Sequence, residues 1–287
     1  MAKPVLKWAG GKTVILKEIE KRLNNIETSN ACFYDVFAGG ASVTIKFHDR
    51  FMKCVINDTN KELKHVYDSI KNTPSKLMLL LDIHAENHSH DYFYKIRVSD
   101  RDLTYEQLSE VEKAARTIYL NKTCYNGLYR VNSKGQFNVP LGRQKNISIY
   151  DKDNIEVLSS IFQKIDILNK DFSVVLKECK AGDIVYIDPP YDKINNLSFV
   201  EYNVSRFDEF DQERLKREID ELTEKGVYVI ASNSYTENTA KLYKEYIDEH
   251  SIIKVKRSIA SKNASRLPVE EILIDNIEKV KKNASKN

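Results

Sequence analysis

The sequence has few of the residues, and none of the long apolar runs, that mark secreted, zinc-binding or membrane proteins. Only four cysteines occur in 287 residues, without the paired spacing of a zinc site or a disulfide framework: Cys32, Cys54, Cys124 and Cys179. No apolar run approaches the roughly 18 residues of a membrane span, and the N-terminus lacks a signal-peptide core. We therefore expect a cytoplasmic protein of one or two globular domains, with no membrane contact and no metal.

Acidic residues are missing from three windows. None lies between Glu112 and Asp151, in residues 1–17 or in residues 250–269, whereas residues 201–224 hold nine acids. The cations of the first window are Lys113, Arg116, Lys122, Arg130, Lys134, Arg143 and Lys145. This segregation predicts one acidic face and one basic face, the latter typical of contact with a phosphate backbone. Any single window fits ordinary solvated surface as well.

One stretch joins a predicted buried strand to a turn whose side chains could bind or activate a ligand. Residues 184–187 form an unbroken apolar run, which predicts a strand buried on both faces of a parallel sheet. Pro189 and Pro190 end it, because neither can donate to a ladder. Asp188 and Tyr191 then lie where open α/β sheets bind ligands. A carboxylate and an outward carbonyl can both accept hydrogen bonds from an amino group, and the flat Tyr191 ring can stack on a planar ring that carries it. A Pro-Pro turn with a solvated Asp explains these residues equally well.

Two glycine loops precede this strand. Residues 8–12 (Trp-Ala-Gly-Gly-Lys) lead into an amphipathic helix, and such a loop suits an anion or a carboxylate. A P-loop is excluded, because it needs glycine where Leu6 stands. Residues 37–40 (Phe-Ala-Gly-Gly) separate a strand from a helix that begins near Ser42, so the backbone there can approach a ligand closely.

An acid follows the next predicted strand. Residues 54–57 are expected to form that strand, and Asp58 ends it, about 20 residues after the glycine turn. In nucleotide-binding βαβ units such an acid holds ribose hydroxyls. Alternatively, Asp58 caps a helix over residues 61–70. Together, the turn and the acid favour a nucleoside-containing cofactor.

Residues 60–107 have helical periodicity, and the histidines at 84, 88 and 90 within them fit a polar surface loop better than a metal site.

Residues 119–143 break the periodicity and mix aromatic, Asn, Gly and basic residues. Such side chains can wedge between bases or read their edges, and the alternative is a glycine-rich β-hairpin with a wet surface. The charge pattern favours nucleic-acid contact.

The remaining chain alternates strands and helices. Strands are predicted at 164–168 and 227–231, helices at 211–225 (stopped by Gly226) and 236–248, and a closing hairpin at 252–259 and 271–277. This order predicts an α/β, doubly wound, Rossmann-like sheet. A mostly helical insertion carrying a β-hairpin interrupts it. The expected division is residues 1–59 and 147–287 for the sheet domain and residues 60–146 for the insertion.

The motifs occur in a specific order along nearly the whole chain. They are Trp8-Ala9-Gly10-Gly11-Lys12, Phe37-Ala38-Gly39-Gly40, Asn57-Asp58, Tyr125-Asn126-Gly127-Leu128 with Arg130, Phe137-Asn138-Val139-Pro140, Asp188-Pro189-Pro190-Tyr191 and Arg257-Ser258-Ile259-Ala260-Ser261. In this order the chain resembles the Dam family, adenine-specific DNA methyltransferases of the alpha motif order. Several independent motifs carry more weight than any one of them.

The resemblance implies S-adenosylmethionine as cofactor. The positions that match the family's cofactor contacts are Trp8, Gly10, Lys12, Phe37, Gly39, Asp58, Asp171, Phe172 and Asp188. The two glycine loops would hold the methionine end, Asp58 the ribose, and Asp171 with Phe172 the adenine. The chain departs from the family at Ala41, where the family commonly has glycine.

The resemblance also implies double-stranded DNA as partner and GATC as target. The positions that match the family's DNA contacts are Lys7, Tyr125, Asn126, Leu128, Arg130, Pro140 and Arg143. Tyr125, Asn126 and Leu128 would invade the duplex around an extruded adenine. Arg130 and Pro140 would read base edges. Arg143 would contact a phosphate, and Lys7 a base or the backbone.

The implied reaction is methyl transfer to the 6-amino group of a flipped adenine. Asp188 and the Pro189 carbonyl would accept the amine hydrogens while Tyr191 stacks on the ring. Three alternatives stay open: a methyltransferase for cytosine in DNA, adenine in RNA or protein glutamine; a DNA-binding relative without catalysis; and a nucleotide-binding structural protein. Whether a cognate restriction endonuclease is a further partner is also open.

Overall fold

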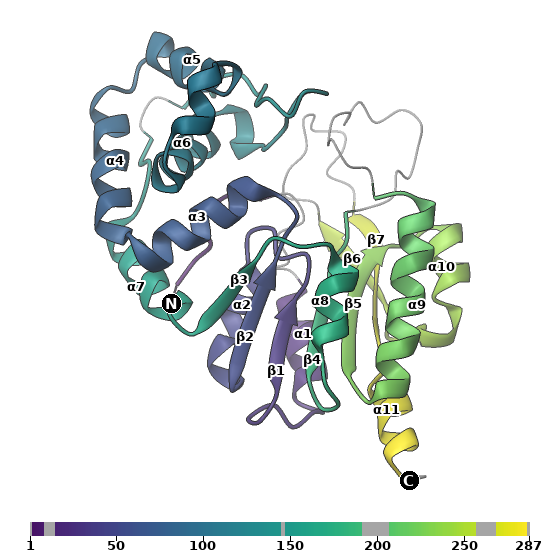
Figure 1. Cartoon of the computed structure of the whole chain (residues 1–287). Helices are drawn as coiled ribbons and strands as arrows, with labels where there is room; N and C mark the ends of the chain where they lie inside the picture. Colours follow the sequence, from purple (N-terminus) through teal and green to yellow (C-terminus); the bar gives the residue numbers. More distant parts are fainter. Residues whose placement is uncertain (1, 9–14, 145–146, 191–206, 257–267, 286–287) are drawn as a thin grey trace.

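The computed structural model describes residues 2–8, 15–144, 147–190, 207–256 and 268–285. Its centre is a seven-stranded sheet of order β3-β2-β1-β4-β5-β7-β6 (Figure 1). The strands are β1 Cys32–Asp35, β2 Lys53–Asn57, β3 Ile165–Leu168, β4 Ile184–Ile187, β5 Tyr228–Ser234, β6 Ile252–Lys256 and β7 Pro268–Asp275. β1 to β5 run parallel, and β7 is antiparallel to β5 and β6. This Rossmann-like sheet confirms the predicted fold class and the predicted closing hairpin.

Helices cover both faces of the sheet. They are α1 Leu16–Leu23, α2 Ser42–Phe47, α3 Lys61–Asn72, α4 Pro74–Glu86, α5 His90–Val98, α6 Glu110–Thr123, α7 Lys152–Phe162, α8 Phe172–Glu178, α9 Glu209–Lys225, α10 Glu237–Leu242 and α11 Ile277–Ala284. Side chains of a strand alternate between two cores, so Phe33 of β1 packs with α1 to α3 while Tyr34 packs with α8 and α9. Gly226 (φ 82°) ends α9, as predicted.

The insertion is mostly helical and lies at the β3 end of the sheet (Figure 1). The prediction that periodicity breaks at Tyr119 is wrong, because α6 continues to Thr123. Nearly every residue of α6 after Glu110 is buried, Ala115 and Ile118 among them. A helix buried all round has no polar face, so its period is invisible in the sequence.

The loop after α6 follows the path of the predicted hairpin without forming strands. Two isolated antiparallel bridges hold it, one joining Cys124 to Leu141 and the other Val131 to Phe137. Asn126 and Gly127 have positive φ (56° and 67°), which breaks an extended strand after the first bridge. The predicted β-hairpin is therefore corrected to a bridged return loop.

Two further predictions need correction. His84 does not belong to a polar surface loop but to α4, where its Nδ1 lies 2.9 Å from the Tyr92 hydroxyl and its ring stacks on Tyr119 with centroids 4.8 Å apart. Half-buried His88 does lie in the loop between α4 and α5, with its Nδ1 2.9 Å from the Tyr119 hydroxyl. The helix predicted at 236–248 ends at Leu242. A short 3-10 turn, Lys244–Tyr246, replaces its second half.

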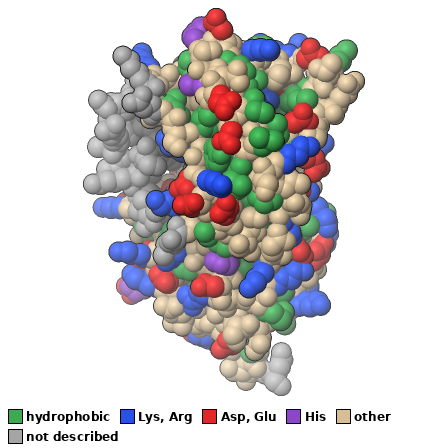
Figure 2. Space-filling view, turned by 90° about the vertical axis from the view of Figure 1, so that its left-hand side faces the viewer, with side chains coloured by type: hydrophobic (Ala, Val, Ile, Leu, Met, Phe, Trp, Pro, Cys, Tyr) green, Lys and Arg blue, Asp and Glu red, His purple; other side chains and the backbone are tan. Residues whose placement is uncertain are grey.

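The predicted basic face is smaller than the sequence suggests. Lys113 and Arg116 are buried, and they pair with Glu106 and Asp100 at 3.5 and 2.8 Å. Neither can belong to a basic surface. On the side of the molecule seen in Figure 2, Lys and Arg side chains are interspersed with Asp and Glu. That side is therefore not the basic face.

Candidate active site

The carboxyl ends of β1 to β4 meet at one edge of the sheet because these strands run parallel. The buried side chain of Asn57 joins the loops there. Its Nδ2 donates to the carbonyls of Val36 and Lys170 at 3.1 and 3.0 Å, and its Oδ1 accepts from the Lys170 N–H at 2.9 Å. One amide thus fixes the segments that follow β1, β2 and β3.

Asp58 supports the glycine turn. Its carboxylate accepts from the N–H groups of Gly39 (3.0 Å) and Asn60 (2.9 Å), and burial raises its pKa. Asn60, rather than Asp58, caps α3, so the alternative reading of Asp58 as a helix cap is excluded. Trp8 covers the turn so closely that a Cβ on Gly39 (φ 48°) would come within 2.7 Å of its ring. Tyr67 donates its hydroxyl hydrogen to the Gly39 carbonyl.

Ala41 has the backbone conformation that glycine adopts more easily. Its φ of 55° is left-handed, and its side chain is fully buried. A methyl group in this region is strained by roughly 1 kcal/mol. The turn therefore tolerates alanine where the Dam family commonly has glycine, and burial of the methyl group offsets part of the strain.

Asp35 is the most buried acid of this edge. Its Oδ2 accepts from Thr44 Oγ1 at 2.8 Å, while its Oδ1 is buried and has no hydrogen-bond partner among the described residues. Burial, and secondarily the charges of Asp188 and Asp58, raises the Asp35 pKa to about 7. The raised pKa therefore reflects mainly the burial of this carboxyl group, with a smaller contribution from the neighbouring acids.

The half-buried Asp188 follows β4, and its Oδ1 accepts from Ser232 Oγ at 3.0 Å. Pro189 is buried directly after it. β4 lies beside β1, so Asp188 and the Gly39 turn belong to the same edge. The predicted site residues Gly10, Lys12 and Tyr191, and the motif at 257–261, lie outside the described residues.

The predicted adenine-binding pair lies at the end of β3. Asp171 caps α8 through the Ser173 N–H (2.9 Å), and its other oxygen pairs with Arg214 at 2.9 Å. The Phe172 ring lies 5.5 Å from Phe37, with the Arg214 guanidinium 4.2 Å from its centroid. Phe37 and Phe172 thus come together in one aromatic cluster, while Asp171 is already engaged by a cation.

The structure brings Lys7 to the loop that is predicted to read DNA. Asn121 Oδ1 accepts from the Lys7 N–H at 2.9 Å, and its Nδ2 donates to the carbonyls of Lys7 (2.9 Å) and Gly127 (3.0 Å). A Cβ on Gly127 would come within 2.6 Å of the Lys7 side chain. Lys7 and Asn126 are exposed, and Tyr125 and Leu128 are half-buried.

The other predicted DNA contacts are exposed on the same loop. Arg130 Nε donates to Asn138 Oδ1 at 2.7 Å, and the Pro140 carbonyl accepts from the Tyr125 N–H at 2.8 Å. Arg143 follows the second half of the return loop, two residues after the bridged Leu141. Arg130, Pro140 and Arg143 therefore share one exposed loop with Tyr125.

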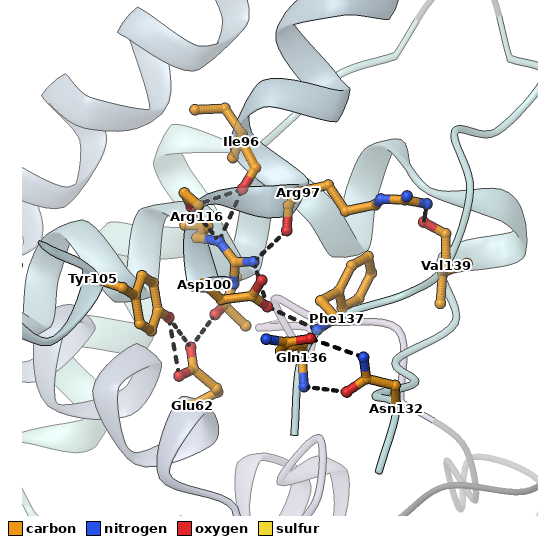
Figure 3. Close-up of polar contacts among 12 residues, drawn as sticks. Glu62, Ile96, Arg97, Asp100, Tyr105, Arg116, Asn132, Gln136, Phe137 and Val139 are labelled. Atoms are coloured by element: carbon orange, nitrogen blue, oxygen red, sulfur yellow. Dashed lines mark hydrogen bonds and ion pairs between the residues drawn. The ribbon is translucent and has the colours of Figure 1, made fainter. Parts of the chain in front are cut away.

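A buried ion pair supports this loop from the insertion (Figure 3). Asp100 Oδ2 pairs with Arg116 at 2.8 Å and also accepts from the Phe137 N–H at 2.7 Å. Arg116 donates to the carbonyls of Ile96 and Arg97 at 3.0 and 2.9 Å. Through these contacts α5 and α6 fix the position of Phe137, with which the second half of the return loop begins.

Four residues that organise these loops were not predicted from the sequence: Asp35, Asp100, Asn121 and Ser232. A weak signal existed for two of them. Asn121 follows an apolar run in Ile118-Tyr119-Leu120, and Ser232 follows one in Val229-Ile230-Ala231. Polar side chains at the end of buried segments usually have a specific partner.

Within the described parts of the chain, no group of three or more His, Cys, Asp or Glu side chains could hold a metal ion. The helices of those parts are also too short or too polar to cross a membrane.

Comparison with known proteins gives extensive matches. The family model of D12 class N6 adenine-specific DNA methyltransferases matches residues 8–260. The type II methyltransferase M1.LlaDCHI of Lactococcus lactis subsp. cremoris is 40% identical over 277 residues, covering 96% of this chain and 95% of the relative. M.MjaIII of Methanocaldococcus jannaschii is 38% identical (96% and 99% covered), and the retron Ec67 DNA adenine methylase of Escherichia coli is 30% identical (94% and 90%). Because the matched region spans most of the chain and contains both the glycine turn and Asp188, this chain belongs to the D12 class N6 adenine-specific DNA methyltransferase family.

Proposed function

We propose that this protein transfers a methyl group from S-adenosylmethionine to the 6-amino group of adenine in double-stranded DNA, at GATC. The observation that carries the proposal is the meeting of two groups at one sheet edge. Asp188 follows β4, and the Gly39 turn, held by Asp58, follows the adjacent β1. Asp188 can accept hydrogen bonds from an amine, and the Gly39 turn with Asp58 can bind a nucleoside cofactor. Family membership supplies the reaction class.

The residues at this edge fit a cationic nucleoside. The buried Asp35 Oδ1 has no partner among the described residues, and buried carboxylates are normally paired or bound to a cation. Asp58 accepts two N–H bonds, and since a carboxylate has about four acceptor positions, it can also accept ribose hydroxyls. Trp8 and Phe37 add aromatic surface. When bound, S-adenosylmethionine supplies an activated methyl group.

Asp188 and the Pro189 carbonyl would accept the two hydrogens of the adenine amine. These bonds draw lone-pair density toward the nitrogen and hold it in one position, and such alignment is worth roughly 7–11 kcal/mol over a bimolecular encounter. Tyr191 is proposed to stack on the ring. The adenine must first leave the duplex, which costs a few kcal/mol.

The loop at 124–143 is the proposed DNA reader. This loop carries six of the predicted contact residues, and Asn121 and the bridges hold it beside Lys7. Exposed Arg130 and Asn126 can reach base edges, and exposed Lys7 and Arg143 can reach phosphates. We assign residues 60–146 to target recognition. The GATC target is inferred from the similarity of residues 125–130 and 137–140 to the Dam family.

The test is methylation of a plasmid by the purified protein and S-adenosylmethionine. The plasmid is then challenged with nucleases that differ in their sensitivity to methylated GATC. We expect protection at GATC alone, and tritium transfer to duplex DNA but not to RNA or protein. Methylation at another sequence would refute the target, and methyl transfer only to cytosine, RNA or protein would refute the substrate.

Two relatives are named type II methyltransferases, which favours a role beside a restriction endonuclease of the same specificity. Expression of this protein should then let cells survive a GATC endonuclease that kills them otherwise. Survival that requires Asp188 would support this role, and death despite full methyl transfer in vitro would count against it.

A further inference from the structure

Two buried hydroxyl groups that have no part in the proposed methyl transfer lie in a chain that ends at Asp188. Ser232 Oγ on β5 donates to Asp188 Oδ1 at 3.0 Å and lies 3.1 Å from the hydroxyl of Tyr186 on β4. Serine has one hydroxyl hydrogen, so once it is donated to the carboxylate, Tyr186 must donate to the serine oxygen. Ser232 is 0% exposed and Tyr186 is 2% exposed. Burial raises the pKa of Tyr186 well above its usual value, so its phenol keeps the proton.

We propose that Ser232 is a positioning residue for methyl transfer, which fixes the orientation of Asp188 and is itself oriented by Tyr186. The inference rests on the proposed function, in which Asp188 accepts a hydrogen bond from the adenine amine. The terminal torsion of an aspartate is broad, so its carboxylate needs an external contact to hold one angle. A charge-assisted bond from a buried central strand supplies that contact, and the tyrosine bond strengthens it.

The same strand offers a matched control. Ser234 lies two residues along β5 and therefore points to the same face of the sheet. It is 1% exposed, and its Oγ has no hydrogen-bond partner among the described residues. Ser234→Ala thus removes the same atom from the same strand without removing a bond to Asp188.

The experiment compares Ser232→Ala, Tyr186→Phe, the double variant and Ser234→Ala in the full-length protein. Single-turnover methyl transfer to a GATC duplex is measured together with the Kd for S-adenosylmethionine, the Kd for DNA and the Tm. We expect about tenfold slower transfer for Ser232→Ala with both Kd values within about twofold of wild type. Tyr186→Phe should slow transfer about threefold alone and not at all in the Ser232→Ala background, because it acts through the serine.

The outcomes separate this inference from the proposed function. Wild-type rates in Ser232→Ala, with Asp188→Ala inactive, would overturn the inference alone. So would additive losses in the double variant, an equal loss in Ser234→Ala, or a slower rate that is explained by weaker binding. A wild-type protein without activity on GATC duplexes would instead overturn the proposed function.

Discussion

The sheet edge and the helical insertion both bury charged groups, but only the insertion pairs its most buried carboxylate with a cation. At the edge, Asp35 and Asp58 accept hydrogen bonds from neutral donors, with no cation in contact among the described residues. In the insertion, Asp100 meets Arg116 and Lys113 meets Glu106. A buried carboxylate without a cation destabilises the fold, whereas a paired one does so far less.

This difference indicates two kinds of task. The insertion pairs Asp100 with Arg116 within the chain, so this pair can hold the proposed DNA-reading loop in place before any ligand arrives. The edge leaves acceptors for a ligand, and a positively charged cofactor would supply the missing charge. Four substitutions test this contrast.

Asp188→Ala should abolish methyl transfer, by about a thousandfold or more, and leave the Kd for S-adenosylmethionine nearly unchanged. The carboxylate is the proposed acceptor for the amine, so its loss removes the contact made during reaction. Tritium transfer and calorimetric titration measure the two quantities. Asp166→Ala, which removes an exposed acid in a surface pair with Lys53, is the control and should behave as wild type. Near-normal turnover would refute the assigned role.

Arg116→Met should lower the free energy of unfolding by about 3–5 kcal/mol, because it leaves Asp100 buried without its cation. Urea unfolding measures the loss. Adding Asp100→Asn should restore part of it, since the buried charge is then gone. If the single variant unfolds like wild type, the insertion does not depend on this pair and the contrast with the sheet edge is lost.

Asp35→Asn should stabilise the protein without cofactor at pH 8, by about 4 kcal/mol at most. The folded pKa of about 7 lies above the unfolded value of 3.8, so the folded state binds the extra proton. Stability from this group is present below pH 3.8 and is lost as the pH rises through 7. Unfolding from pH 5 to 8 should therefore show a more positive slope of stability against pH in the variant. An unchanged slope would show that Asp35 does not titrate there.

His84→Phe should make the slope of stability against pH less positive. At pH 5 the variant should keep about 1–2 kcal/mol of stability that the wild type loses. Burial, and secondarily Arg116, lowers the His84 pKa to about 4, below its ordinary 6.5. The unfolded state then binds more protons between pH 4 and 6.5, so wild-type stability falls as the pH falls through that window. The same pH series measures it, and the variant should keep its stability at pH 5. Parallel curves for the two proteins would contradict a buried neutral histidine.

Local features of the fold were predictable from the sequence. The unbroken apolar run at 184–187, the glycine turn at 39–40 and the stop at Gly226 each depend on neighbours along the chain. Asp188 and Asp58 were predictable for the same reason, because they follow buried strands. The residues that align them were not. Asn121 contacts Lys7, and Asp100 contacts the Phe137 N–H, across long stretches of sequence.

The sequence alone determined the order of strands and helices, the residues at the strand ends and the family. Three-dimensional packing sets which buried polar atoms find partners. Asp100 Oδ2 meets Arg116 and Ser232 meets Asp188, whereas Asp35 Oδ1 and Asp100 Oδ1 have no hydrogen-bond partner among the described residues. Periodicity and turn chemistry act between residues that are close in the chain, and packing must exist before distant polar groups can meet or be left unpaired.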